Sequence, residues 1–131
     1  MPRYTDPLGL VITTNSAAAA ACYVDGVDLL LSSSPEANAM LQAAVAADPA
    51  FGVALAALAW GSAGQAGTDG APLDALAAHV ARSVSVTRRE RQHIEIVVTA
   101  LRGDPERARA LGSEHLREFP ADALVAHIIR N

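Results

Sequence analysis

The sequence predicts an all-α fold in which about seven antiparallel helices pack closely together. Alanine, the best helix former, supplies 29 of the 131 residues. Aromatic residues, which favour strands, make up only 4% of the chain. Apolar residues also recur at helical spacing between breaks formed by Pro, Gly, Ser and Asp. The length fits a single domain that covers residues 1–131.

The N-terminal part predicts an irregular lead-in followed by two helices. Prolines and a glycine argue against regular structure over residues 1–12. Thr14 or Asn15 can cap a first helix that runs to about residue 31. Ser34 and Pro35 are the expected N-cap and first residue of a second helix, which ends near residue 47. The positions expected to face inward are Ala17, Ala20, Ala21, Val24, Val27, Leu31, Ala37, Met40, Leu41 and Ala44.

The middle of the chain predicts the most buried helix and then a glycine-rich connection. Residues 50–62 are almost entirely apolar, which is typical of a central helix covered on several sides. Residues 61–70 contain four glycines and predict an irregular connection. Pro72 then begins a fourth helix, which is expected to end near Ser83.

The last part of the chain carries the strongest local signals. Residues 87–90 (Thr-Arg-Arg-Glu) form a capping box that begins a fifth helix, and Gly103 ends this helix. Asp104-Pro105 is an N-cap followed by a first-turn proline, and it begins a sixth helix that stops at Pro120. A seventh helix is expected over residues 121–131.

Composition and charge argue against several classes of protein. The net charge is −4, so the chain lacks the basic field that nucleic-acid binding requires. No apolar run approaches the ~20 residues needed to cross a membrane, and residues 8–12 are too short for a signal peptide. Cys22 is the only cysteine, which excludes an internal disulfide and a cysteine metal cluster. We expect a cytoplasmic protein with no metal and no cofactor.

The spacing of the helix ends indicates a repeat. The ends at Asp48-Pro49 and Phe119-Pro120 lie 71 residues apart, about two units of the ~34-residue tetratricopeptide period. Ala37 and Ala108 each stand twelve positions before a proline, where that repeat requires a small residue. Most of the aromatic signature of the repeat is missing. The sequence therefore predicts an α-solenoid of degenerate tetratricopeptide-like repeats.

Five short segments also occur in a characteristic order. They are Thr13-Thr14, residues 47–51 (Ala-Asp-Pro-Ala-Phe), residues 87–93 (Thr-Arg-Arg-Glu-x-x-His), Gly103-Asp104 and residues 120–122 (Pro-Ala-Asp). In this order they resemble the N-terminal part of the family named for tetratricopeptide repeat protein 38, over residues 8–126. The resemblance implies a tetratricopeptide-like α-solenoid and no particular reaction. Family members continue with further helical repeats, whereas this sequence stops inside the seventh helix.

The densest polar cluster in the sequence lies at the start of the fifth helix. Arginines at a helix N-terminus can hold an anion or the carboxylate of a partner. Glu90 and His93, three residues apart on one helix face, could also act as acid and base. The structural alternative is a helix cap with surface ion pairs and a histidine packed between helices. The residues concerned are Arg88, Arg89, Glu90, Arg91 and His93.

Two other groups of residues have both a functional and a structural interpretation. Trp60 and Tyr23 could stack on a ligand, although such aromatics more often belong to a core or an interface. Asp25 and Asp28 could hold a cation, although a solvated helix face with Cys22 as a small core residue explains them equally.

The remaining histidines are His79, His115 and His127, and their spacing does not indicate a metal site. His115 lies on the apolar side of its helix, which favours a hydrogen-bonded core histidine. We found no Ser-His-Asp elbow, phosphate loop or zinc signature in the sequence.

The first functional hypothesis is a helical-repeat interaction module with no catalytic residues, which binds a protein or peptide. Its last helix would leave an apolar edge, and a second copy of the chain is expected to cover that edge in a dimer. The alternative is a small all-α enzyme or small-molecule binder with a site between Trp60, the glycine-rich connection and residues 88–93. A third hypothesis is a fragment of a longer family member. The expected edge consists of Leu124, Val125, Ile128 and Ile129.

Overall fold

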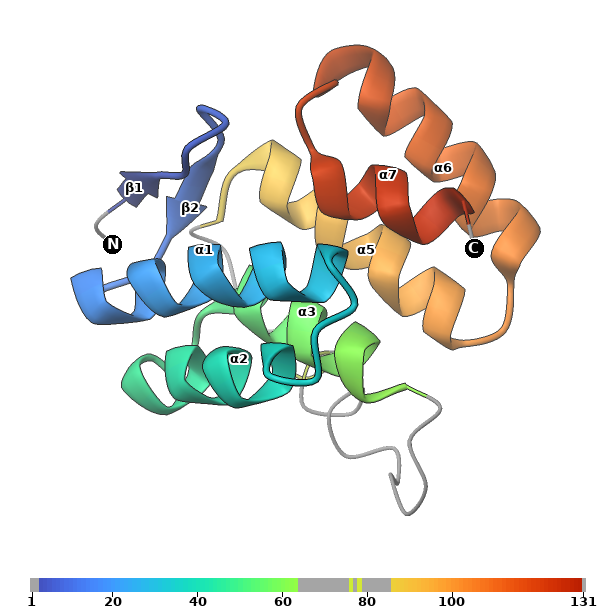
Figure 1. The fold of residues 1–131 in the computed structure, drawn as a ribbon. Helices are drawn as coiled ribbons and strands as arrows, with labels where there is room; N and C mark the ends of the chain where they lie inside the picture. The colour runs from blue at the N-terminus through green and yellow to red at the C-terminus, as the bar shows by residue number, and fades with distance from the viewer. Residues whose placement is uncertain (1–2, 64–75, 77, 79–85, 131) are drawn as a thin grey trace.

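The computed structural model describes residues 3–63, 76, 78 and 86–130 (Figure 1). The described chain is mostly helical and carries one short β-hairpin, which confirms the all-α prediction in its main point. The expected helix at residues 72–83 lies outside the described residues except for Leu76 and Ala78, which both have helical backbone. The elements are β1 (Arg3–Thr5), β2 (Val11–Thr13), α1 (Ala17–Leu31), α2 (Ala37–Ala47), α3 (Gly52–Ser62), α5 (Arg88–Leu101), α6 (Pro105–Glu118) and α7 (Ala123–Arg130).

The N-terminal segment is an antiparallel β-hairpin, so the prediction of an irregular lead-in was wrong. The side chain of Asp6 holds the turn, because its Oδ1 accepts hydrogen bonds of 2.9 Å from the amides of Leu8 and Leu10. Gly9 follows with a φ of +83°, which glycine adopts readily. Two strands of three residues are too short to show the alternation that identifies a strand in a sequence.

Most helix boundaries follow the predicted caps. The capping box of Thr87 and the N-cap Asp104 are both present, and Gly103 has the expected positive φ of +89°. The first helix differs, because Ser16 rather than Thr14 or Asn15 is its N-cap. The α2 helix begins two residues later than predicted and has no side-chain cap.

The inward face of α1 differs from the predicted stripe. Ala17 and Ala21 are exposed, whereas Tyr23 and Gly26 are buried. Five consecutive alanines define no preferred face, so the larger neighbours decide which side turns inward. Tyr23 packs on Phe51 with ring centroids 5.2 Å apart. Gly26 lets α1 approach its antiparallel neighbour α2 closely.

Helix α3 lies at the centre, as predicted, between α2 and α5 (Figure 1). Seven of its eleven residues are buried, and these are one glycine and six apolar residues. Small side chains allow its neighbours to approach on several sides. Its buried residues are Gly52, Val53, Ala54, Leu55, Ala56, Ala57 and Ala59.

The C-terminal helices form an antiparallel α5–α6 pair on which α7 packs back (Figure 1). The exposed fractions of Leu124, Val125 and Ile128 are 2%, 0% and 3%. Ile129 is partly buried and packs toward Gly112 of α6. The chain itself therefore covers these side chains, which corrects the expectation of an open apolar edge.

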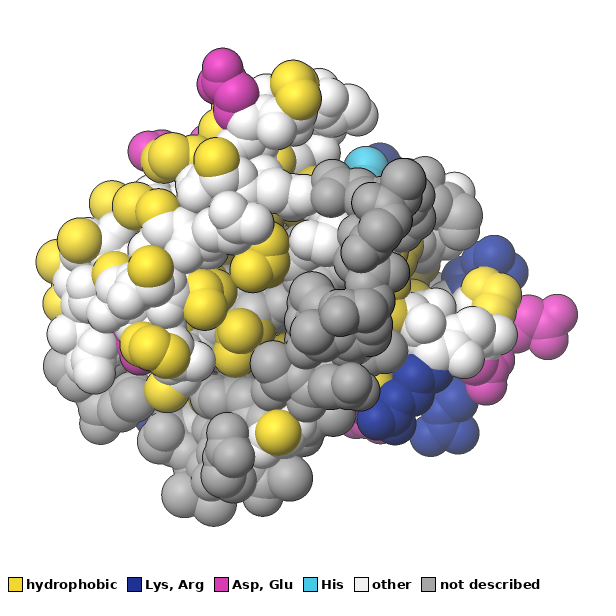
Figure 2. All heavy atoms as spheres, turned by 90° about the horizontal axis from the view of Figure 1, so that it is seen from below, with side chains coloured by type: hydrophobic (Ala, Val, Ile, Leu, Met, Phe, Trp, Pro, Cys, Tyr) yellow, Lys and Arg dark blue, Asp and Glu magenta, His cyan; other side chains and the backbone are white. Residues whose placement is uncertain are grey.

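Charge is unevenly distributed over the surface. Helix α2 contains no charged residue. On the left-hand side of the view from below, the described atoms are mainly hydrophobic or uncharged (Figure 2). Arginine side chains gather at the opposite side of the same view (Figure 2).

We predict that Gly26→Ala destabilises the protein although alanine is the better helix former. A Cβ at this position would lie 2.7 Å from Cδ2 and 2.8 Å from Cγ of Leu41. The clash should cost about 1–3 kcal/mol, against a propensity gain of about 1 kcal/mol. Urea denaturation measures the free energy of unfolding. In a double-mutant cycle, Leu41→Ala should cost less in the Gly26→Ala background than alone. Additive effects would contradict the close approach.

Candidate functional site

Buried polar side chains gather where the β-hairpin meets the C-terminal helices. They come from β2, from α5, from α6 and from the residue directly before α7. In a compact domain such groups must be hydrogen-bonded to one another or to the backbone. We call this set the buried polar cluster, and it consists of Thr13, Arg89, Glu90, His93, His115 and Asp122.

The carboxylate of Glu90 joins strand β2 to the start of α5. Its Oε2 accepts from the Thr13 amide at 2.9 Å, and its Oε1 accepts from the Thr13 hydroxyl at 2.6 Å. Oε1 also accepts from the Thr87 amide at 3.1 Å and completes the capping box. The exposed fraction of Glu90 is 0%. One side chain therefore both caps α5 and binds a strand 77 residues away in sequence.

Asp122 is the second buried carboxylate of the cluster. Its Oδ2 accepts from Arg89 at 3.1 Å, from His93 Nδ1 at 3.0 Å and from His115 Nε2 at 2.8 Å. Because an ionised carboxylate only accepts hydrogen bonds, both facing histidine nitrogens carry protons. The second terminal nitrogen of Arg89 donates to the Val11 carbonyl at 2.7 Å. Asp122 thus connects α5, α6 and α7, and Arg89 extends the connection to β2.

Electrostatics keep Asp122 ionised. Burial by itself raises the pKa of this carboxyl group. The charge of His93, the hydrogen bonds from His115 and His93 and the charge of Arg89 together outweigh that effect. They hold the pKa of Asp122 well below its usual range.

His115 is a hydrogen-bonded core histidine, as predicted. Its exposed fraction is 3%, and its Nδ1 lies 2.8 Å from the side-chain oxygen of Gln92. His93 is also packed between helices, as the structural alternative required. Two buried nitrogens, Arg89 Nε and His93 Nε2, lack a hydrogen-bond partner among the residues that the structure describes.

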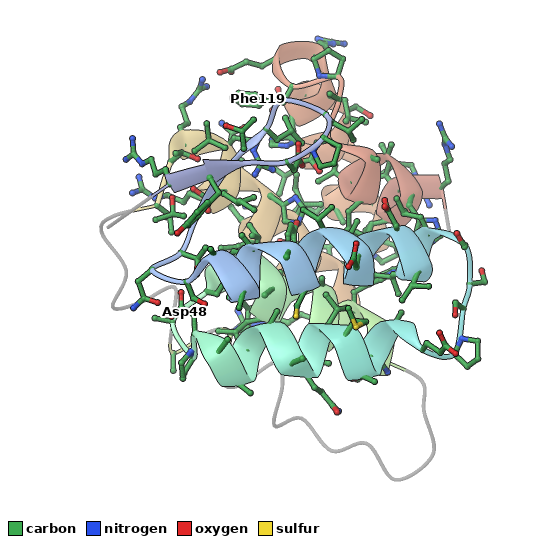
Figure 3. The ribbon with its side chains drawn as sticks, turned by 60° about the vertical axis from the view of Figure 1, so that its left-hand side comes forward. Asp48 and Phe119 are labelled. Carbon is green, nitrogen blue, oxygen red and sulfur yellow. The ribbon has the colours of Figure 1, made fainter. Side chains whose placement is uncertain are left out.

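A second polar junction ties the start of α1 to the turn after α2. Asp48 is buried and accepts from the Thr14 hydroxyl at 2.5 Å and from the Ala50 amide at 3.1 Å. Figure 3 shows Asp48 at this turn, while Phe119 lies far from it at the end of α6. Thr13 and Thr14 therefore anchor the segment after the hairpin to two different parts of the helical body.

A pocket of about 130 Å³ opens beside the buried polar cluster. We call it the hairpin pocket, because the turn of the β-hairpin, α1 and the start of α7 enclose it. Tyr23 and Asp122 contribute buried polar groups, and Asp6 and Asp28 contribute more exposed ones. Burial raises the pKa of Tyr23, with the nearby Arg89 opposing this effect. The apolar walls include Leu8, Leu10, Val24, Val27, Leu31 and Leu124.

The structure separates the residues that were predicted to form one site. Glu90 is buried near the beginning of α5, whereas Trp60 lines a pocket with Ala100 near the end of α5. Ten residues of helix put these positions about 15 Å apart. Trp60 and the segment at residues 88–93 therefore do not converge on one site. The glycine-rich connection beyond residue 63 lies outside the described residues.

The predicted arginines have different environments. Arg88 is exposed, forms an ion pair with Glu118 and lines a groove of about 380 Å³ between α5 and α6. Arg89 is buried, with an exposed fraction of 5%, and belongs to the buried polar cluster. Arg91 is exposed. Only Arg88 and Arg91 are therefore available at the surface.

The remaining candidates follow their structural interpretations. Asp25 and Asp28 are exposed on α1, and Cys22 is partly buried against the core. No group of three or more His, Cys, Asp or Glu side chains within the described residues could hold a metal ion. His127 is partly buried on α7, and His79 lies outside the described residues.

Thr13, Asp48 and Asp122 belong to the sequence segments described above, but their side chains were not predicted to form a shared network. Asp122 carries one local signal, because an aspartate that follows Pro120 stands in the N-cap position of a new helix. The contact between Thr13 and Glu90 has no local signal, since it joins residues far apart in the chain.

We compared the chain with known proteins, and no protein-family model, curated protein or solved structure matches it. Within the described part of the chain, no helix is both long and apolar enough to span a membrane. The interpretation of the site therefore depends on its geometry alone.

We predict that Asp122→Asn lowers the free energy of unfolding by about 3–5 kcal/mol at pH 7, because it leaves the buried guanidinium of Arg89 without a counter-charge. The folded pKa of Asp122 lies below the unfolded value of about 3.9. Its contribution is therefore complete above that value and is lost as the pH falls below it. The difference between the two proteins should shrink by about 1 kcal/mol by pH 3.

Urea denaturation at several pH values provides this measurement. Asp25→Asn is the matched control, since Asp25 is exposed and should change stability little. A difference that stays constant between pH 7 and pH 3 would show that Asp122 is not held ionised by its neighbours.

Proposed function

We propose that this chain is a protein-interaction module with no chemistry of its own. We further propose that its helices form degenerate tetratricopeptide-like repeats, related to the family named for tetratricopeptide repeat protein 38, and that it acts in the cytoplasm. The antiparallel packing of successive helices supports the repeat assignment. The resemblance in sequence supports the family assignment.

The main support for the proposal is that the buried polar side chains are engaged in hydrogen bonds within the protein. The exposed fractions of Glu90 and His93 are both 0%. Glu90 is occupied by Thr13 and Thr87, and His93 is occupied by Asp122. These groups hold the hairpin and the C-terminal helices together, so a substrate would have to displace internal hydrogen bonds to reach them. A structural role explains these hydrogen bonds without an added ligand.

Surface features remain available for a partner. Leu8 is the one exposed large hydrophobic side chain among the described residues, with an exposed fraction of 56%. The groove between α5 and α6 offers mixed charges, including Arg88. We do not propose self-association through α7, because Leu124, Val125 and Ile128 are already buried within the chain.

We predict that native mass spectrometry of the chain isolated from its own host finds a stoichiometric complex with another protein. The fraction that remains monomeric should carry no unexplained small mass. A monomer with a bound small molecule and without a protein partner would contradict the proposal and favour a small-molecule binder.

Histidine modification with diethyl pyrocarbonate supplies the control for a hidden enzyme site. His93 and His115 should react far more slowly in the folded protein than in the urea-unfolded chain, because both rings are buried. Equal reaction rates in the two states would show that a substrate can reach the rings.

A further inference from the structure

The hairpin pocket has the size of a receptor for one side chain. Its volume of about 130 Å³ is close to that of an apolar cavity of ~150 Å³, which holds one benzene molecule. Its walls are mainly aliphatic and come from three separate elements. An aliphatic side chain of a partner would fill it, and its apolar surface would be removed from water. This burial of apolar surface is the main source of favourable binding energy.

The lip of the pocket adds an apolar contact. Leu8 lies in the turn that Asp6 holds, and its side chain is largely exposed. A single exposed leucine is ordinary on a protein surface. Here it adjoins an apolar pocket, so the two features form one continuous docking surface at the tip of the hairpin.

The charges around the pocket indicate which charge its occupant should carry. Among the residues that the structure describes, Asp6 and Asp28 line it, and no arginine or histidine does. The third lining carboxylate, Asp122, is already matched by Arg89 and the two histidines of the buried polar cluster. The uncompensated charge at the pocket is therefore negative, and it favours basic groups on the partner.

We infer that the hairpin pocket binds a segment of a partner protein in which an aliphatic residue is flanked by lysine or arginine. The aliphatic side chain occupies the pocket beside Leu8, and the basic side chains lie against Asp6 and Asp28. Since the inference rests on the proposed interaction function, its test must distinguish failure of the pocket from failure of that function.

The test uses NMR titration of the full, isotope-labelled chain with short synthetic peptides. The probe carries Lys-Leu-Lys in a glycine-serine context, and two controls replace its leucine by serine or its lysines by glutamate. We expect the probe to shift the amide signals of residues 6–10 and 23–28. Both controls should bind at least about tenfold more weakly, a difference of 1.4 kcal/mol. Added salt should weaken the binding of the probe, because it screens the attraction between charges.

Matched variants of the chain localise the effect. Asp28→Asn should weaken probe binding several-fold, whereas Asp25→Asn, three residues away on the same exposed side of α1 but outside the pocket, should not. Leu8→Ser should also weaken binding. Its side chain is exposed, so the fold should be unaffected, which unchanged NMR spectra of the free variant would verify.

The inference is overturned if the probe leaves the pocket signals unchanged or if both aspartate variants bind it equally. It is also overturned if the pocket signals shift with chain concentration alone, which would identify a second copy as the occupant. A host partner retained equally by the wild type and by Leu8→Ser would also reject the pocket while leaving the interaction function intact. The absence of any host partner would instead reject the proposed function.

Discussion

The structure depends on the requirement that a buried carboxylate be surrounded by hydrogen-bond donors. Glu90 meets this requirement by accepting from residues on both sides of the α5 terminus, Thr87 within the cap and Thr13 on the hairpin. The same contact therefore sets the start of α5 and the position of β2. An isolated hairpin of this size would be marginal in water. The hydrogen bonds of the hairpin to Glu90 and Arg89 supply the stability that its two short strands lack.

The second half of the network orders the C-terminal helices. Asp122 lies between helices and is matched by Arg89, His93 and His115. Burying such charges is costly, and an apolar replacement of the same shape is often no less stable. We attribute the network to specificity, because it defines which residues of β2, α5, α6 and α7 meet. The same arrangement leaves Tyr23 and the hairpin pocket on the outer side of the cluster.

The sequence predicted what local rules decide. The capping box at Thr87, the N-cap at Asp104 and the break at Gly103 are each determined by a few neighbouring residues, and the structure confirms all three. The face of α1 could not be predicted, because its run of alanines has no side that differs from another. The contact between Thr13 and Glu90 could not be predicted either, since only the tertiary fold brings the two residues together.

A double-mutant cycle between Thr13 and Glu90 tests the central claim most directly. Urea denaturation would give the free energies of unfolding of Thr13→Val, Glu90→Gln and the double variant, with exposed Glu95→Gln as the control. We predict a coupling energy of about 1.5–3 kcal/mol, the range for hydrogen bonds to a charged group. A coupling energy near zero would show that the hydrogen bond from the Thr13 hydroxyl to this buried carboxylate does not help to hold the hairpin on α5.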